Sequence, residues 1–557
     1  MTDSGPRPPL PSQRGRSAGP LRSERSCVLA RRGMVCASVP SASAAGVEML
    51  RRGGNAVDAA LAAAAVLGVV EPMSTGVGGD AFALLWSARE GRLVGLNGSG
   101  RAPAGATLEA YRRRGLERVE PRGILAATVP GAVHAWETLS ERFGTLPMAD
   151  LLEPAVRLAR DGFPVTELVA HYWWGLERGG ALHNPAARRT WMRDGRTPLA
   201  GETFRVPELA RTLEAIAKGG ARAFYAGEIA DAIVETSREE GGFLAHADLE
   251  AHTSTWVEPI STAYRDVEVA ELPPNGQGLA ALIGLNVLES FDSGEVADGS
   301  ALAWHRRIEA IKLAFADRNA YVADPEHAQV PVEALLDKAY ARRRAAAIGE
   351  RALPGAAPGL GGDTVYLCAA DDQGNLVSFI QSLFTGFGCG VGCGETGVVL
   401  QSRGAGFRLD PSHPSALAPG KRPFHTIIPG MLLRRDGAGA PRPWTAFGVM
   451  GGDVQPQGHL AFVSNVVDAG LNPQEALDRP RFRYLQDRDV VIETPDAPVS
   501  EGGRLADALR ARGHRVHEPD PWMADVFGGG QAVALLPDGT LVGASDRRKD
   551  GCALGLH

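Results

Sequence analysis

The order of apolar and polar positions predicts helices in the first part of the chain, with a hairpin between them. Residues 41–70 are rich in Ala, carry one Gly-Gly break and are followed by Pro72, a pattern that predicts two helices. Residues 81–86 and 93–96 are apolar runs on either side of a polar turn, which predicts a β-hairpin. Residues 131–238 are mostly helical in pattern, with turns at Pro and Gly.

The second part of the chain adds more hairpins and a linker. Strand composition returns at 254–272 and the helical pattern at 301–347. Residues 352–362 are a Gly/Pro/Ala linker without periodicity. Two further hairpins are predicted at 364–383 and 531–544, where β-rich runs flank turns. Antiparallel hairpins with two long helical blocks indicate an α+β or layered α/β/α fold and argue against a Rossmann fold.

Composition excludes several classes of protein. The chain has 557 residues, 44% of them apolar, and a net charge of −7 that is too evenly mixed for a nucleic-acid partner. Its longest strongly apolar run, 59–70, is too short to span a membrane. Residues 1–33 are rich in Pro, Ser and Arg and lack the apolar core of a secretory signal, which predicts a disordered extension on a cytoplasmic protein.

One junction in the sequence could supply a nucleophile that activates itself. The flexible linker ends on Thr364, where a rigid hairpin begins. Most Thr residues that open a strand are structural, because β-branched residues suit strands. If the preceding bond were cut, however, the new α-amine would have a pKa near 7.7–8.0 and could take the proton of the Thr hydroxyl.

A Gly-rich turn could serve that nucleophile, and no cofactor is implied. Successive N–H groups at Gly451 and Gly452 could form an oxyanion hole, although a plain Gly turn explains the same residues. Cys389 and Cys393 would need two more ligands to hold zinc, and none is obvious nearby. We therefore expect neither a metal nor an organic cofactor.

Short segments spread along almost the whole chain match a known family. The chain resembles the γ-glutamyltransferase (glutathione hydrolase) family of N-terminal nucleophile hydrolases. The matching segments are Gly53–Ala60, Gly76–Asp80, Ala102–Thr107, Val129–Val133, Gly362–Thr364, Gly374-Asn375, Pro419–Lys421, Gly451-Gly452 and Gly543–Asp546. These segments follow the order that they have in the family.

The resemblance implies both a fold and a maturation step. The fold would be a four-layer αββα sandwich, made as one precursor that cleaves itself at Asp363–Thr364. The products would be a large subunit, 34–363, and a small subunit, 364–557, with 1–33 as an extension or the result of a mis-set start codon. The two subunits would be each other's partner, and a small-molecule amide would be the substrate.

The resemblance also implies roles for individual residues. Thr364 would be the nucleophile, and Ser382 would hold the position of a Thr that hydrogen-bonds it. Gly451 and Gly452 would form the oxyanion hole. The remaining implied contacts are with the carboxylate of the substrate, at Arg101, His425 and Thr426.

Departures from the family pattern concern the substrate. Phe384 stands where γ-glutamyl-binding members have Asn, and Gly406 stands where they have the Asp that pairs with the glutamyl ammonium. Losing such a carboxylate removes several kcal/mol of recognition. Arg403 adds positive charge, and Asp453 is a possible replacement for the missing partner.

The class of substrate is left open by these residues. The segments Gln381–Phe384, Pro423–Pro429 and Met450–Asp453 look like those of an oxamate amidohydrolase-like branch. We expect an amidohydrolase that cleaves small carboxylate-bearing amides, either γ-glutamyl compounds such as glutathione or short acidic amides. An inactive scaffold of the same fold is the alternative from another class.

Overall fold

Two seven-stranded antiparallel sheets form the centre of the molecule. The computed structural model describes residues 23, 25–355, 362–499, 502–519 and 524–557. The strands of the first sheet are, in spatial order, β1 (Val28–Ala30), β18 (Leu541–Ser545), β17 (Gly529–Leu535), β13 (Pro441–Met450), β12 (Gly430–Arg435), β9 (Val267–Glu271) and β8 (Ile260–Tyr264). Those of the second sheet are β19 (Cys552–Leu556), β2 (Gly33–Ala37), β10 (Asp363–Asp371), β11 (Leu376–Phe384), β3 (Asp80–Ser87), β4 (Arg92–Gly98) and β7 (Thr255–Val257).

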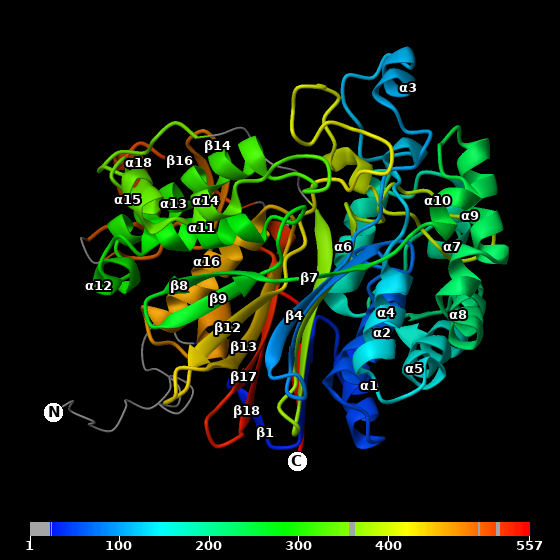
Figure 1. Ribbon diagram of the computed structural model, residues 1–557, viewed down its shortest axis with the longest axis horizontal. Helices are drawn as coiled ribbons and strands as arrows, with labels where there is room; N and C mark the ends of the chain where they lie inside the picture. The colour runs from blue at the N-terminus through cyan, green and yellow to red at the C-terminus, as the bar shows by residue number, and fades with distance from the viewer. Residues whose placement is uncertain (1–22, 24, 356–361, 500–501, 520–523) are drawn as a thin grey trace.

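Helices cover the outer face of each sheet, so the layers run helix, sheet, sheet, helix (Figure 1). On the side of the first sheet lie α11 (Gly278–Leu288), α12 (Ser293–Ala297), α13 (Ala301–Tyr321), α14 (Val332–Leu336), α15 (Lys338–Ala345), α16 (Val454–Val467), α17 (Pro473–Asp478) and α18 (Leu505–Ala511). On the side of the second sheet lie α1 (Pro40–Arg51), α2 (Ala56–Val70), α4 (Ala132–Phe143), α5 (Met148–Asp161), α6 (Glu167–Arg178), α7 (Pro185–Trp191), α8 (Pro207–Tyr225), α9 (Glu228–Glu239) and α10 (His246–Glu250). The predicted αββα sandwich is confirmed.

Smaller elements lie outside these layers. A short helix, α3 (Leu108–Arg113), projects from the helical side of the second sheet (Figure 1). The minor sheets are formed by β14 (Phe482–Gln486), β15 (Asp489–Ile492) and β16 (Arg515–His517), and by β5 (Phe163–Pro164) with β6 (Thr203–Phe204). Within the described ranges, no helix is long and apolar enough to cross a membrane.

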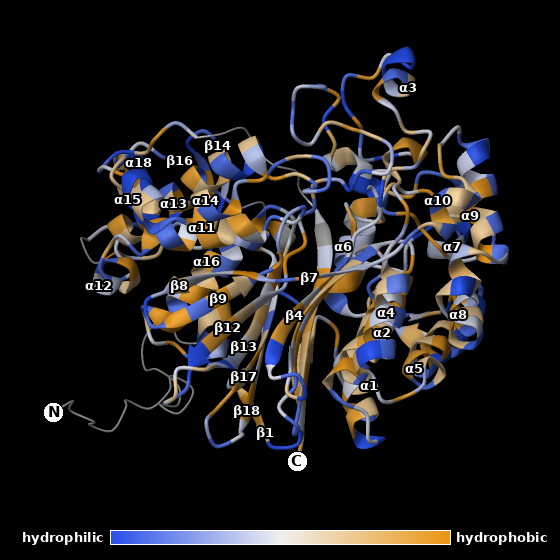
Figure 2. Cartoon of the chain, in the orientation of Figure 1, coloured by the Kyte–Doolittle hydropathy of each residue, from blue (hydrophilic) through white to orange (hydrophobic). Residues whose placement is uncertain are grey.

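Apolar side chains fill the space between the two sheets. Tyr366, Ile380 and Met431 belong to this inner cluster and are fully buried. Figure 2 shows hydrophobic residues on the strands and hydrophilic residues on the outer turns of the helices. Gly448 of β13 permits close packing, since a Cβ there would lie 2.4 Å from the Tyr366 ring. The sheets therefore pack against each other along β10 and β13.

Most predicted elements are present, and one boundary was wrong. Asn55 caps the second N-terminal helix after the Gly-Gly break, and the three predicted hairpins form β3–β4, β10–β11 and β17–β18. The predicted extension, 1–33, was too long. Val28–Ala30 form β1, because their backbone pairs with Leu541–Gly543 of β18. Residues 1–22 and 24 lie outside the described residues.

The parts of the chain before and after Thr364 share both large sheets. In the second sheet, β10 and β11 lie between β2 and β3. In the first, β8 and β9 continue a sheet whose other central strands come from beyond residue 364. A cut before Thr364 would therefore leave two pieces joined by strand pairing and a common core.

Candidate active site

Thr364 lies at the buried start of β10. Its side chain is inaccessible to solvent, and its Oγ1 donates a hydrogen bond of 3.2 Å to Ser382 Oγ on the neighbouring strand. The register between β10 and β11 shifts between Asp363 and Val365. Such an irregularity re-aims side chains relative to the strand's regular alternation. The structure thus brings together the two hydroxyls that the sequence singled out.

Phe384 connects this pair to a buried cation. Its backbone has φ +82°, a conformation that bulky residues rarely adopt and that functional sites tend to retain. Its N–H donates to Ser382 Oγ at 2.8 Å. Its ring lies 4.5 Å from the guanidinium carbon of Arg403. Phe384 therefore contacts both Arg403 and the hydroxyl pair.

Arg403 is fully buried at the start of a short 3-10 turn, Arg403–Gly406. Its Nη1 donates to Thr426 Oγ1 at 2.7 Å. Burial lowers the pKa of Arg403 to about 9, and the charge of Asp80 partly opposes that effect. Arg403 therefore remains a cation at neutral pH, inside the protein and next to the hydroxyl pair.

His425 is engaged within the protein. Its Nε2 lies 3.0 Å from Asp80 Oδ2, and its Nδ1 accepts a 3.4 Å hydrogen bond from the Ile427 N–H. Burial and the charge of Arg403 lower the pKa of His425 well below its usual value, so the ring is neutral and Nε2–H donates to Asp80. Burial raises the pKa of Asp80 to about 7. Both ring nitrogens of His425 therefore have partners within the protein.

The glycine pair forms the turn between β13 and α16. Gly451 has φ +125° and Gly452 has φ +60°, values that favour glycine. Gln277 Nε2 donates to the carbonyl oxygens of Gly452 at 2.9 Å and Thr426 at 2.8 Å. The turn also precedes the N-terminus of α16, where the helix dipole favours negative charge. This geometry suits the stabilisation of an oxyanion.

Contacts between the sheets show how β13, which leads into this turn, runs relative to β10. Tyr366 of β10 packs against Gly448, while Ser378 Oγ of β11 lies 3.4 Å from the Phe447 carbonyl oxygen. Ser378 pairs with Cys368, and Cys368 is farther along β10 from Thr364 than Tyr366 is. The end of β13, which leads into the glycine turn, therefore lies on the same side as the start of β10, where Thr364 is.

Asp453 is already paired with a cation. Its Oδ1 accepts a hydrogen bond from Arg318 Nη1 at 2.6 Å, and the two side chains are buried together. Burial raises the pKa of Asp453, whereas the charge of Arg318 lowers it. This pairing argues against Asp453 as the replacement partner for a substrate ammonium.

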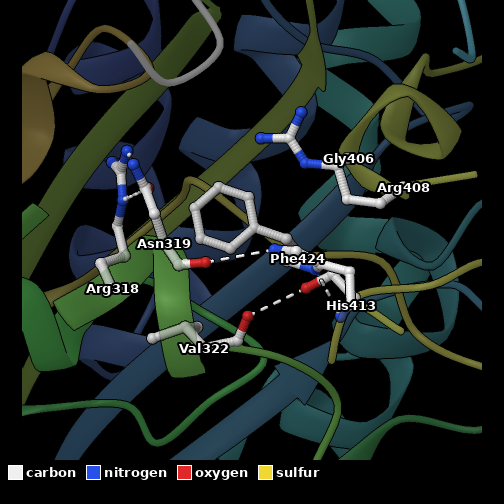
Figure 3. Close-up of a pocket in the computed structure, with 8 residues that line it drawn as sticks. Arg318, Asn319, Val322, Gly406, Arg408, His413 and Phe424 are labelled. Carbon is white, nitrogen blue, oxygen red and sulfur yellow. Dashed lines mark hydrogen bonds between the residues drawn. The ribbon is translucent and has the colours of Figure 1, made fainter. Parts of the chain in front are cut away.

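A small cavity lies beside Gly406 (Figure 3). Its volume is about 30 Å³, and a Cβ on Gly406 would lie 2.6 Å from the Phe424 carbonyl oxygen. The cavity is lined by Arg318, Asn319, Val322, Gly406, Arg408, His413, Ser415 and Phe424. Figure 3 shows the Phe424 ring between the side chains of Arg318 and Arg408. No acidic side chain is in that lining set, which gives an ammonium group no anionic partner there.

Arg101 lies in a different environment. Its Nη2 pairs with Glu326 at 2.9 Å, its Nη1 donates to the Gly420 carbonyl, and its side chain is 27% exposed. The structure therefore gives Arg101 partners of its own instead of a contact with the buried Arg403 group.

One cluster has metal-ligating residue types. In the part of the chain that the structure describes, only His305, Glu309 and His514 have ligand atoms close enough to share an ion. The Lys312 ammonium, however, donates to Glu309 at 2.7 Å, and His305 Nδ1 lies 2.9 Å from His514 Nε2. A cation already occupies the carboxylate, so the contacts are those of a structural cluster.

Three residues of the site had no role in the sequence analysis. Asp80 is the last residue of the segment Gly76–Asp80, which matches the family, so the sequence did hold a signal for it. Gln277 followed a Pro/Gly turn just before α11, and Arg318 lay inside a long helical stretch, so neither carried a signal of its own. Their places in the site depend on contacts with residues far along the chain, such as the hydrogen bond from Arg318 to Asp453.

Comparisons with known proteins agree with this geometry. The family described as Gamma-glutamyltranspeptidase matches residues 42–556. The glutathione hydrolase-like YwrD proenzyme of Bacillus subtilis is 38% identical over 522 residues, 92% of this chain and 97% of the relative. The oxamate amidohydrolase proenzyme of Klebsiella pneumoniae is 37% identical over 537 residues, 94% of this chain and 98% of the relative.

A solved structure gives the same result for the fold. The cephalosporin acylase from Bacillus halodurans superimposes with a TM-score of 0.89 and 44% sequence identity. The match covers 97% of this chain and 99% of the acylase. The resemblance seen in the sequence is confirmed.

Proposed function

Because the chain belongs to the γ-glutamyltranspeptidase family and is a self-processing amidohydrolase, we propose that Thr364 is its nucleophile. The observation that carries the proposal is the buried hydrogen bond from Thr364 Oγ1 to Ser382 Oγ. The bond to be cut is Asp363–Thr364, which β10 contains unbroken. The products are the subunits 34–363 and 364–557, with any preceding residues on the larger one.

Self-cleavage needs no group beyond the chain and water. Thr364 Oγ1 attacks the Asp363 carbonyl carbon, the peptide C–N bond breaks, and an ester forms while the Thr nitrogen takes up a proton. Water then hydrolyses the ester, which restores the hydroxyl and leaves the Asp363 carboxylate and a free α-amine on Thr364. That amine has the pKa range needed to accept the hydroxyl proton in later turnovers.

Substrate hydrolysis repeats the same chemistry on an external amide. Thr364 Oγ1 attacks the amide carbon as its proton passes to the α-amine, and the N–H groups of Gly451 and Gly452 stabilise the oxyanion. The C–N bond breaks, and the leaving amine takes the proton. Water then attacks the ester on Thr364 and releases the acid. Each step uses Thr364, its α-amine after cleavage, the Gly451-Gly452 turn or water.

We assign the substrate to small amides that carry a carboxylate. The relatives are named a glutathione hydrolase-like proenzyme, an oxamate amidohydrolase proenzyme and a cephalosporin acylase. The buried cation Arg403 supports an anionic substrate. The α-ammonium of a γ-glutamyl group would lack an anionic partner here, because Gly406 has no carboxylate and Asp453 is paired with Arg318.

The ammonium can be tested directly. A γ-glutamyl anilide and the same anilide without its α-amine differ by one charged group. We expect kcat/KM to be at least about tenfold higher for the compound without the amine, because a buried ammonium without a partner is unfavourable by more than 1.4 kcal/mol. A higher value for the amine-bearing compound would restore ordinary γ-glutamyl recognition.

A substitution at Ser382 tests the surroundings of the nucleophile and should have a smaller effect. Ser382→Ala removes an acceptor of the Thr364 hydroxyl, so kcat should fall about twofold to tenfold, as expected for a hydrogen bond of about 0.5–1.5 kcal/mol. Ser378→Ala is the matched control, because it removes a hydroxyl from the same strand that contacts Tyr366 instead. Equal kcat values for the two variants would contradict the role of Ser382.

Denaturing electrophoresis of the purified protein tests the proposal as a whole. Two bands of the sizes expected for a cut before Thr364 support the enzyme, and a single full-length band supports the inactive scaffold.

We also propose a cytoplasmic location, supported by six cysteines that are all free thiols. Recovery of the enzyme outside the cytoplasmic fraction of producing cells would contradict that location.

A further inference from the structure

We propose that one edge of the Arg403 guanidinium, formed by Nε and Nη2, binds a carboxylate on the acyl part of the substrate. The substrates would then be monoamides of short dicarboxylic acids. This inference rests on the proposed function, since it concerns the acyl group that Thr364 would carry. It goes further by assigning a binding group and the chemistry of the acid.

The hydrogen bonding of Arg403 is incomplete in a specific way. Nη1 donates to Thr426 Oγ1 at 2.7 Å. Nε and Nη2 are both buried and have no hydrogen-bond partner among the residues that the structure describes. In a guanidinium, Nε–H and one N–H of Nη2 point the same way, at the spacing of two carboxylate oxygens. The donors without partners are therefore the pair that holds a carboxylate in a bidentate manner.

Burial makes this incomplete bonding unfavourable unless a ligand completes it. A buried charge needs a partner and hydrogen bonds to offset the loss of water. Asp80 acts on Arg403 through its charge, but its oxygens are hydrogen-bonded elsewhere. The Asp80 partners are His425, Gln401 and the N–H groups of Gly100 and Gly131. An anionic ligand would supply what Asp80 does not.

The surroundings hold the guanidinium in a fixed orientation. The Phe384 ring lies 4.5 Å from its central carbon, and Thr426 holds one end. A planar cation on an aromatic face loses little freedom when it binds a planar anion. The edge is therefore preorganised for a carboxylate.

The position of Arg403 indicates which part of the substrate carries the carboxylate. Phe384 donates to Ser382, which accepts from Thr364, so two side chains connect Arg403 with the nucleophile. Arg403, Ser382 and Thr364 are all fully buried. The amine must leave first and reach solvent, while the acyl group stays on Thr364. A buried anchor suits the group that stays, and its nearness to Thr364 requires a short acid.

Calorimetry on the mature enzyme tests this inference with free acids. The probes are oxalate, malonate, succinate and glutarate, each compared with the monoacid of the same length, such as butyrate for succinate. We expect at least one diacid to bind at least tenfold more tightly than its monoacid and to inhibit competitively. Monoacids that bind as tightly as every diacid would overturn the inference without any variant.

Variants identify the group responsible. Arg403→Lys keeps the charge but removes the fork, and we expect it to weaken binding of the preferred diacid at least tenfold while monoacid binding stays unchanged. The expected kinetic signature is a larger rise in KM than fall in kcat. Arg112→Lys is the matched control, because it alters an exposed guanidinium that contacts Leu409 in the segment after the Arg403 turn.

The outcomes separate this inference from the proposed function. Self-cleavage and amide hydrolysis by the wild type test Thr364 alone. If the wild type is cut and active, but Arg403→Lys binds diacids as tightly as the wild type does, only the Arg403 assignment fails. If Arg403→Lys is not cut, the wild-type comparison of diacids with monoacids still decides.

Discussion

Replacement of Thr364 by alanine is expected to give one uncut chain without amide hydrolysis. The same hydroxyl attacks the Asp363–Thr364 bond and later the substrate, so its loss should abolish both reactions instead of only slowing them. Electrophoresis should show a single band, and hydrolysis should fall to background. Thr262→Ala is the matched control, since Thr262 is buried in the other sheet and bonds Asn286. Efficient cutting of the Thr364→Ala chain would exclude Thr364 as the nucleophile.

The serine variant at the same position refines this expectation. Thr364→Ser keeps the hydroxyl and, once cut, the α-amine, so partial cutting and partial activity are expected. Activity of the cut wild type should fall as pH drops below about 7.7–8.0, because protonation removes the base. A rate that is independent of pH between 6 and 9 would point to another proton acceptor.

The local elements of this fold were accessible from the sequence because their signals are local. The hairpin of β10 and β11 follows a linker and has its turn marked by Asp371 to Asn375. The break between α1 and α2 coincides with Gly53-Gly54, and Asn55 caps the second helix. The N-terminal boundary was wrong because β1 has only three residues and depends on β18, more than 500 residues away.

The arrangement of the site could be predicted only in part, because it depends on contacts across the fold. His425 was assigned to the substrate, yet Asp80, 345 residues away, engages it. Asp453 was considered as an anionic partner, yet Arg318 is paired with it, 135 residues away. Sequence patterns identify residue types suited to chemistry, whereas burial and pairing decide which of them remain available.

These pairings also give the site its charge. Asp80 and Asp453 are each engaged by groups of the protein, whereas two donors of Arg403 have no partner among the described residues. A buried cation whose nearby carboxylate is hydrogen-bonded to other groups creates a positive potential in a medium of low dielectric constant. The same potential would stabilise both a bound carboxylate and the developing oxyanion, so substrate binding and catalysis draw on one arrangement of charge.

The turn at Gly451 and Gly452 carries the second large expected effect. Gly451→Val and Gly452→Val should each lower kcat about 100- to 1,000-fold, the range for loss of one oxyanion donor. β-Branched residues do not tolerate the φ values of +125° and +60° found here, so the peptide groups must rotate and their N–H groups turn away. At Gly451 a Cβ would also meet the Gly528 Cα at 3.2 Å.

The measurement is kcat at saturating substrate on chains that have already been cut. Thermal unfolding of each variant shows whether a fall in kcat reflects the site or the fold. Gly439→Val is the matched control, since Gly439 has φ +85° in the exposed turn before β13 and a Cβ there meets no atom within 4 Å. It introduces the same kind of strain far from Thr364 and should leave kcat within about twofold. Near wild-type turnover at both Gly451→Val and Gly452→Val would place the oxyanion hole elsewhere.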